Sequence, residues 1–290
     1  MGRYIMFKLM DYSKENKMNS AVQLLFFAVV WTQLSGLSLA YEYCKNKEYF
    51  TLVTTCSLNK VHVALFFRLQ PMGKGMEMVA VVPMTTKLKN KFLELHDKCR
   101  NEIACGEVKD STGKLFPKAT RMRNLIWDYE LAYIAQVHAE RCHMQHDKCR
   151  NTDRFPISGQ NLYYSSKSEP GRSLMNEINR SVMNWFGEHK DVKDGVAAAK
   201  KFPREDLKKI GHFTVMVNDH VSRIGCGMTY CTNYNKGIKM YYYFITCNYD
   251  YSNVGRIYAD GDAKSKCDEW ETTPSSEYSC LCHNNGKIFG

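Results

Sequence analysis

The sequence lacks the features that define several protein classes. It contains no block of five charges of one sign, no internal repeat and no low-complexity segment. Apart from one stretch near the N-terminus, no apolar run approaches the roughly 20 residues that a transmembrane helix needs. These absences argue against a repeat protein and against a membrane span in the main part of the chain.

The overall composition is that of an ordinary globular protein. Hydrophobic residues make up 44% of the chain and charged residues 24%. A length of 290 residues is enough for one large domain or two small ones. The net charge of +10 is spread along the chain and primarily indicates a soluble protein with a basic surface. Attraction to acidic surfaces is the second, weaker interpretation. We expect a monomer that binds no nucleic acid.

The N-terminal 40 residues predict secretion. Ala21–Trp31 is an apolar core of signal-peptide length, Lys14 and Lys17 precede it, and Ser38 and Ala40 provide small residues for cleavage after Ala40. The alternatives, a buried helix or a membrane anchor, are disfavoured because an anchor usually needs about 20 apolar residues. We therefore assign residues 1–40 to an N-terminal extension and signal peptide, and expect an extracellular product.

The chain has twelve cysteines, two of them in the stretch CHMQHDKCRN from Cys142 to Asn151. Structural zinc sites usually bring cysteines in closer pairs, and extracellular thiols usually form disulfides. His143 and His146 could share a helix face, but two histidines make only half of a metal site. We expect the cysteines to be disulfide-bonded and His143 to be exposed on a loop.

Three segments have the spacing of apolar residues that is typical of amphipathic helices. The first begins near Lys87, and Asp128 and Ser173 can cap the second and the third. The predicted buried faces consist of Leu88, Phe92, Leu95, Cys99 and Ile103, of Leu131, Ile134, Ala135 and Ala139, and of Leu174, Ile178, Val182, Trp185 and Phe186.

The last third of the chain changes to a strand pattern. Arg223–Tyr230 and Lys239–Asn248 are rich in β-branched and aromatic residues, and the connector Thr232–Gly237 resembles a turn. Helices followed by a hairpin predict an α+β fold, such as a three-layer α-β-α sandwich around an antiparallel sheet. We place an irregular, cysteine-bearing arm at 41–84, the main domain at 85–255 and a cysteine-containing tail at 256–290.

Six motifs carry a resemblance to a known family. They are HAERCHMQHDKCRN, SGQNLYY, WFGEH, GHFTVMV, IGCGM and FITCNYDYSN, in the order and spacing of the CAP superfamily. This superfamily includes cysteine-rich secretory proteins, antigen 5 and plant pathogenesis-related proteins, and the sequence is most similar to the antigen 5-related proteins of insects, dipteran ones especially. The resemblance covers about Lys87 to Cys282 and implies an α-β-α sandwich with a central cleft.

The resemblance also implies a set of cleft residues. Two histidines and two glutamates face the cleft in the family, and three of these positions correspond to His146, Glu188 and His212. Gln160 stands at the fourth, where an amide keeps hydrogen bonding but cannot serve as a general base. No cofactor is required, although His146 and His212 could hold a divalent cation such as Zn²⁺ weakly, with Glu188 as a supporting acceptor.

The resemblance implies some disulfides and leaves others open. Cys226 and Cys247 match a family disulfide, Cys56 is expected to pair with Cys149, and Cys267 with either Cys280 or Cys282. Cys44 and Cys142 lose their usual partners, so that they either pair with each other or stay free. The remaining cysteines, Cys99, Cys105 and Cys231, suggest rearranged pairing or intermolecular bonds.

Asn179 begins the single N-x-S/T sequon. Because Asn179 lies in the middle of a predicted helix, glycosylation requires an exposed face.

Three functions compete. The leading hypothesis is a secreted, non-enzymatic protein that binds a lipid, another small hydrophobic ligand or an extracellular protein. The second is a secreted metal-dependent hydrolase or peptidase that uses His146, Glu188 and His212, although no activated serine or cysteine can be placed beside them. The third is an ion-channel modulator, which is disfavoured because only three cysteines lie beyond Tyr251.

Overall fold

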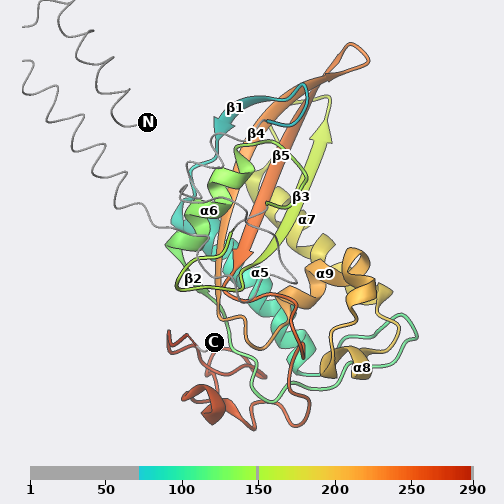
Figure 1. Ribbon diagram of the computed structural model, residues 1–290, viewed down its shortest axis with the longest axis vertical. Coiled ribbons are helices and arrows are strands. Elements are labelled where there is room, and N and C mark those ends of the chain that lie inside the picture. The colour runs from blue at the N-terminus through green and yellow to red at the C-terminus, as the bar shows by residue number, and fades with distance from the viewer. Residues whose placement is uncertain (1–71, 148–149, 289–290) are drawn as a thin grey trace, which may run out of the picture. The chain divides into compact units, whose positions relative to one another are not determined.

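The computed structural model describes residues 72–147 and 150–288 (Figure 1). The predicted signal peptide and most of the predicted arm lie outside the described residues, as do Cys44, Cys56 and Cys149. Across the described part of the chain, no helix is both long enough and apolar enough to cross a membrane.

The three predicted helices are present: α5 (Thr86–Ala104), α6 (Tyr129–Ala139) and α7 (Leu174–Gly187). As predicted, the Asp128 side chain accepts hydrogen bonds from the first backbone N–H groups of α6, and Ser173 caps α7 in the same way. All residues of the three predicted faces are buried, except for one that is half-buried at the start of α7. The helices are therefore held by their apolar faces and by their caps.

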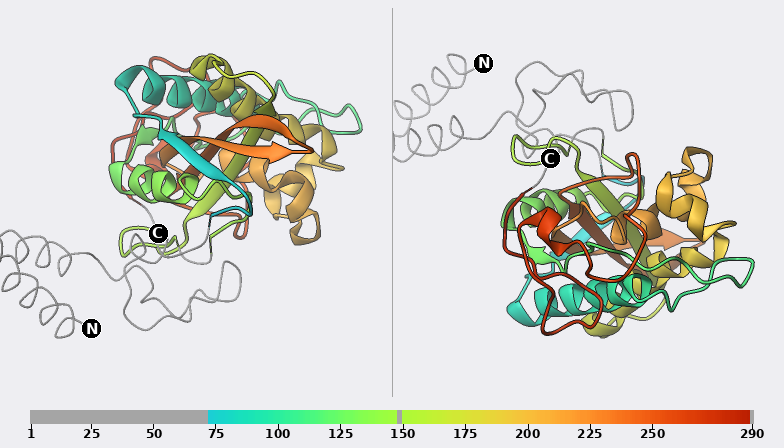
Figure 2. Two further views of the ribbon diagram at one scale, coloured as in Figure 1. Left: turned by 90° about the horizontal axis from the view of Figure 1, so that it is seen from above. Right: turned by 90° about the horizontal axis from the view of Figure 1, so that it is seen from below.

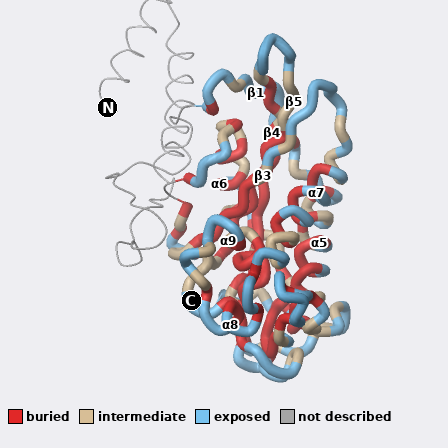
Figure 3. The backbone as a smooth tube through the Cα atoms, turned by 90° about the vertical axis from the view of Figure 1, so that its right-hand side faces the viewer, coloured by how far each residue is buried: buried red, intermediate tan, exposed pale blue. Residues whose placement is uncertain are grey.

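The predicted hairpin forms the middle of a five-stranded sheet with the order β1-β4-β5-β3. Strands β4 (Arg223–Asn235) and β5 (Ile238–Tyr249) pair antiparallel along their whole length. Their connector is tighter than we expected, because Lys236 and Gly237 both have positive φ and form a two-residue turn. The tip of this hairpin is exposed, whereas most of the remaining residues of β4 and β5 are buried (Figure 3).

Three further strands complete the sheet. β1 (Glu77–Val81) and β3 (Gly159–Lys167) pair antiparallel with β4 and β5, and β2 (Ile126–Trp127) pairs parallel with the start of β4. Our expectation of an irregular arm at 41–84 is thus wrong for residues 77–81, because the edge of β4 supplies backbone partners that periodicity cannot reveal. β3 pairs with β5 along its whole length, from Gly159 to Lys167.

The helices lie on both faces of the sheet, and the three-layer α-β-α sandwich is confirmed. Helix α6 covers one face, and α5 and α7 lie together on the other (Figure 2). Two short helices that the sequence pattern did not indicate, α8 (Gly195–Lys200) and α9 (Leu207–Met216), follow α7. Helix α9 contacts α7 and β3, which places it at one end of the sheet.

Two glycines of β4 explain the IGCGM motif. A Cβ at Gly225 would lie 2.0 Å from the backbone nitrogen of Ala132, and one at Gly227 would lie 2.2 Å from the Cα of Gln136. Both Ala132 and Gln136 belong to α6, so the helix backbone rests directly on the strand. Cys226, between the two glycines, points to the opposite face.

Four disulfide bonds join cysteines of the described residues. Cys226 bonds Cys247 across β4 and β5, as the resemblance implied. In the tail, Cys267 bonds Cys282, which resolves the alternative that we left open. Cys280 bonds Cys105 instead and fastens the tail to the end of α5. The first of these two bonds closes a loop within the tail, and the second attaches the tail to the domain.

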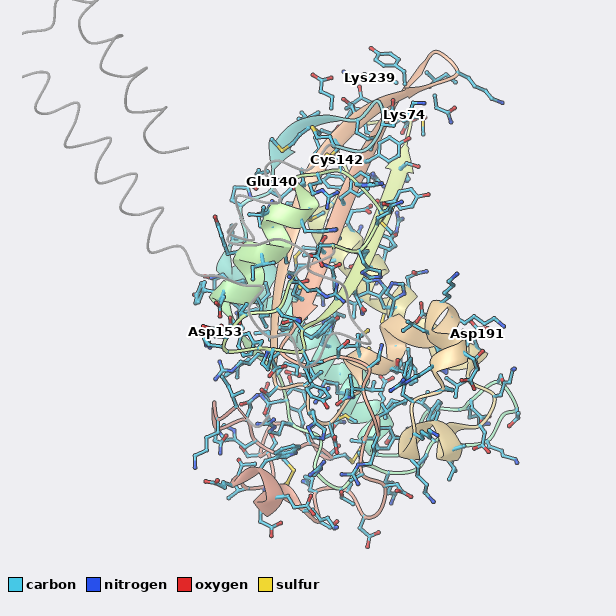
Figure 4. The ribbon with its side chains drawn as sticks, viewed as in Figure 1. Lys74, Glu140, Cys142, Asp153, Asp191 and Lys239 are labelled. Atoms are coloured by element: carbon cyan, nitrogen blue, oxygen red, sulfur yellow. A yellow bond between two sulfur atoms is a disulfide. The ribbon has the colours of Figure 1, made fainter. Side chains whose placement is uncertain are left out.

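Cys142 bonds Cys231. Our expectation that Cys142 pairs with Cys44 or stays free is therefore wrong, because spacing along the chain could not reveal that the segment after α6 lies against the hairpin. Cys142 lies beyond the end of α6, next to the distal half of the hairpin (Figure 4). The two sulfurs are buried together with Phe244 in a small apolar cluster. Cys99 is the free cysteine of the described residues and is buried in α5.

We expect the double substitution Cys142→Ser with Cys231→Ser to lower the free energy of unfolding by about 2–4 kcal/mol, because it opens a long covalent loop. Chemical denaturation measures this loss relative to the wild type with its disulfides intact. Peptide mapping under non-reducing conditions should recover Cys142 joined to Cys231. A Cys142 peptide bonded elsewhere, or alkylated in the native protein, would contradict the assignment.

Candidate functional site

Four separate elements bring the predicted cleft residues together. His146 lies in the loop after α6, Gln160 in β3, and His212 in α9. Glu188 begins the 3-10 turn η1 (Glu188–Asp191), directly after α7. The ring centroids of His146 and His212 are 6.5 Å apart, although 65 residues separate them in the chain.

His146, Gln160 and His212 line a cleft of about 630 Å³. Glu188 does not line this cleft, as the resemblance implied it would, but contacts Nδ1 of His212, as we expected of a supporting acceptor. His143 is also absent from the lining. Three of the four predicted residues thus face the cleft, and the fourth supports one of them.

Glu188 determines the tautomer of His212. Its Oε1 lies 2.6 Å from Nδ1 of His212, and its Oε2 accepts a hydrogen bond of 3.0 Å from the backbone N–H of Phe213. Since the carboxylate is an acceptor, the neutral His212 ring must carry its proton on Nδ1. The indole of Trp185 stacks on the same ring, with centroids 6.3 Å apart, and holds its plane. In the neutral ring, Nε2 of His212 therefore carries the lone pair.

Gln160 makes the corresponding contact with His146. Its Oε1 lies 2.9 Å from Nδ1 of His146. Its Nε2 donates hydrogen bonds of 2.7 Å to Oδ2 of Asp147 and 3.0 Å to Oδ1 of Asn248. Because the oxygen end of the amide faces the ring, Nδ1 of His146 donates and Nε2 again keeps its lone pair.

The charges around His146 favour its neutral form. The surrounding protein removes water from the imidazolium, Arg150 adds a nearby cation, and both lower the pKa of His146. Burial would raise the pKa of Asp147, but the Arg150 cation and His138 outweigh it, so this pKa lies below its usual value. Arg150 donates to Oδ1 of Asp147 at 2.9 Å, which forms a buried ion pair.

The histidine pair fits a weak metal site better than a tight one. Two neutral imidazoles with their Nδ1–H groups bound to acceptors are the arrangement in which Nε2 coordinates a metal. However, no group of three or more histidine, cysteine, aspartate or glutamate side chains in the described residues is arranged to hold an ion. An ion bound by His146 and His212 would need water or a ligand to complete its coordination.

The rest of the cleft lining is apolar and cationic. Phe202, Leu207 and Val215 supply the apolar surface, and the cations Arg204 and Lys208 lie on α9 or just before it. A second cavity of about 740 Å³ shares Phe202 and Arg204 with the cleft. A ligand that enters the cleft would therefore meet apolar surface and positive charge together.

Sequence reasoning missed the residues that support Gln160. Asp147 and Arg150 belong to the quoted stretch HDKCRN and Asn248 to β5, but no spacing indicated that they meet. The sequon residue Asn179 is exposed on α7, so its glycosylation stays a prediction.

Comparison with known proteins gives a consistent result. The sequence matches the model of a family described as "CAP: Cysteine-rich secretory protein family" over residues 93–249. It is 37% identical to "Venom allergen-1" of Aedes aegypti over 209 residues, which is 71% of this chain and 76% of that protein. It is 38% identical to "Antigen 5 like allergen Cul n 1" of Culicoides nubeculosus over 149 residues, or 51% of this chain and 64% of that protein.

The fold is also similar to that of solved structures. One of them, described as "Crystal structure of NaASP2 with Zn2+", aligns with a TM-score of 0.57 and 26% sequence identity, covering 73% of this chain and 100% of that one.

Proposed function

The chain belongs to the cysteine-rich secretory protein (CAP) family, and on this premise we propose that it is a secreted, non-enzymatic protein that binds a small, partly apolar ligand in the cleft beside His146 and His212. Four disulfide bonds and the predicted signal peptide support the extracellular location.

The observation that carries this proposal is the composition of the cleft. Its volume of about 630 Å³ suits a small molecule, since ligand pockets commonly measure about 300–1,000 Å³. Apolar side chains line one part, and a few polar groups with defined donors and acceptors line another. Ligand sites combine these two properties, because apolar area supplies affinity and placed polar groups supply orientation.

We propose that the polar part of the site holds a divalent cation such as Zn²⁺ weakly. His146 and His212 would be the protein ligands, and a bound ion would supply an electrophilic contact for an oxygen of the ligand. The likeness to NaASP2, whose crystal structure is described as one with Zn²⁺, supports this assignment.

The hydrolase alternative has less support than binding. The curated relatives carry the names of allergens, not of enzymes. Ser252 lines the cleft, but no hydrogen bond within the described residues joins its hydroxyl to His146 or His212. The amide of Gln160 cannot accept a proton as a general base.

Two titrations test the proposal. We expect ZnCl₂ to bind the wild-type protein in calorimetry, and His212→Ala to weaken this binding at least about tenfold because one of two ligands is lost.

We expect cis-parinaric acid, a fluorescent fatty acid, to bind as well, and Leu207→Glu to weaken its binding by placing a charge on the apolar wall.

Matched controls exist for both substitutions. His283→Ala removes an exposed histidine of the tail, and Leu115→Glu alters a leucine that is 53% exposed outside the cleft, compared with 49% for Leu207. Neither control should change binding. If correctly oxidised wild-type protein bound neither probe, a function in recognition of a protein target would replace the ligand proposal.

A further inference from the structure

Asp147 is a buried carboxylate next to a histidine of the cleft, yet it does not face the cleft. Its side chain has no exposed surface, and the residue is absent from the lining. One oxygen binds Arg150 at 2.9 Å, and the other accepts from Nε2 of Gln160 at 2.7 Å. A buried charge is costly unless all its hydrogen-bonding capacity is used, so these contacts are strongly held.

We propose that Asp147 is a positioning residue that acts through the Gln160 amide to set the tautomer of His146, so that Nε2 of this ring presents a lone pair to the cleft. This inference rests on the proposed function in one respect: the cation of that proposal would bind this lone pair.

The chemistry of the amide makes Asp147 decisive. A glutamine side chain has an oxygen that only accepts and a nitrogen that only donates, and it can turn by half a rotation at little cost. The carboxylate of Asp147 can only accept, so it must face the nitrogen. The oxygen of Gln160 is then directed toward His146, whose Nδ1 must donate. The carboxylate of Asp147 thus determines, through the Gln160 amide, that the His146 proton lies on Nδ1.

The tautomers of the two histidines are consequently set by two different kinds of contact. Glu188 contacts His212 directly, whereas Asp147 reaches His146 through a neutral amide. This difference also accounts for glutamine at position 160. A second carboxylate there would lie against Asp147 at hydrogen-bond distance, and two such charges cannot both be ionised without a shared proton.

The substitution Asp147→Asn separates this role from simple packing. The Arg150 guanidinium has only donors, so the amide oxygen of the introduced asparagine would stay hydrogen-bonded to Arg150. The amide NH₂ group of the asparagine would then face Gln160. The Gln160 amide must then turn, and its nitrogen would donate to Nδ1 of His146. The proton of this ring is expected to move to Nε2, which removes the lone pair from the cleft.

Long-range ¹H–¹⁵N spectra of histidine-labelled protein at pH 8 report the tautomer without any metal. In the wild type we expect both rings to carry the proton on Nδ1. In Asp147→Asn we expect His146 alone to change to the Nε2–H form, and Zn²⁺ affinity measured by calorimetry to fall about 10–100-fold. Asn248→Ala removes the other acceptor of the same Gln160 nitrogen and should leave the tautomer unchanged.

The outcomes distinguish the inference from the proposed function. An Nε2–H form of His146 in the wild type overturns the inference, and this spectrum requires no variant to fold. An unchanged Nδ1–H form in a folded Asp147→Asn variant overturns it as well. If the tautomer changes as expected but the wild type binds no Zn²⁺, the inference stands and the metal part of the proposed function fails.

Discussion

Replacing Gly225 by alanine is expected to abolish folding of the disulfide-bonded domain. The new methyl carbon would lie 2.0 Å from the backbone nitrogen of Ala132 and 2.5 Å from the carbonyl carbon of Leu131, and neither atom can move without moving α6. Overpacking against backbone atoms exceeds the usual cost of a core substitution, so we expect a loss of more than about 4 kcal/mol. Secretion yield and thermal unfolding measure the effect.

Gly187→Ala is the matched control for this substitution. A Cβ at Gly187 would meet no atom within 4 Å, and its backbone at the end of α7 is helical. We expect normal secretion and a stability equal to or slightly above that of the wild type, because alanine favours helices over glycine by about 1 kcal/mol. A Gly225→Ala protein that is secreted normally and melts within a few degrees of the wild type would disprove the close helix–strand contact.

The second large effect is expected at Glu188. In Glu188→Gln, the backbone N–H of Phe213 still needs an acceptor, so the amide oxygen would face Phe213 and the amide nitrogen would face His212. The nitrogen would donate to Nδ1 of His212, and the ring proton would move to Nε2. We expect Zn²⁺ affinity to fall about 10–100-fold, which is typical when the partner of a metal-binding histidine is lost.

Glu205→Gln removes the same charge from an exposed carboxylate near Arg204 and should leave both the tautomer and the affinity unchanged. The comparison separates a change of tautomer from a loss of negative charge near the cleft. Retention of the Nδ1–H form of His212 in Glu188→Gln, with affinity within twofold of the wild type, would mean that the carboxylate does not govern this ring.

Glu188 and Asp147 use their carboxylates in a similar way. Each acid is used to orient a ring, and neither faces the lining of the cleft. The rings then expose acceptor nitrogens, which favours contact with a cation or with a donor group of a ligand. An oriented histidine pair is well suited to binding, and binding does not require a nucleophile.

Local patterns in the sequence were sufficient for the three long helices and the hairpin. Apolar residues recur with the helical period in α5, α6 and α7, and Asp128 and Ser173 cap their helices through contacts within three residues. Such features depend on neighbours in the chain, so the sequence alone contains them. The motifs also located His146, Gln160 and His212, because their order and spacing resemble those of a family.

Only the tertiary structure decided which distant groups meet. The pairing of β1 with β4, the bond between Cys142 and Cys231, and the contact of Asp147 with Gln160 all join segments that share no period. Glu188 could be placed near His212 from the family pattern, but its position behind the ring follows from how α7 packs on α9. The sequence by itself thus determined the helices, the hairpin and the identity of the cleft residues. The folded chain decided their partners and their tautomers, because these depend on contacts between elements that are brought together only by packing.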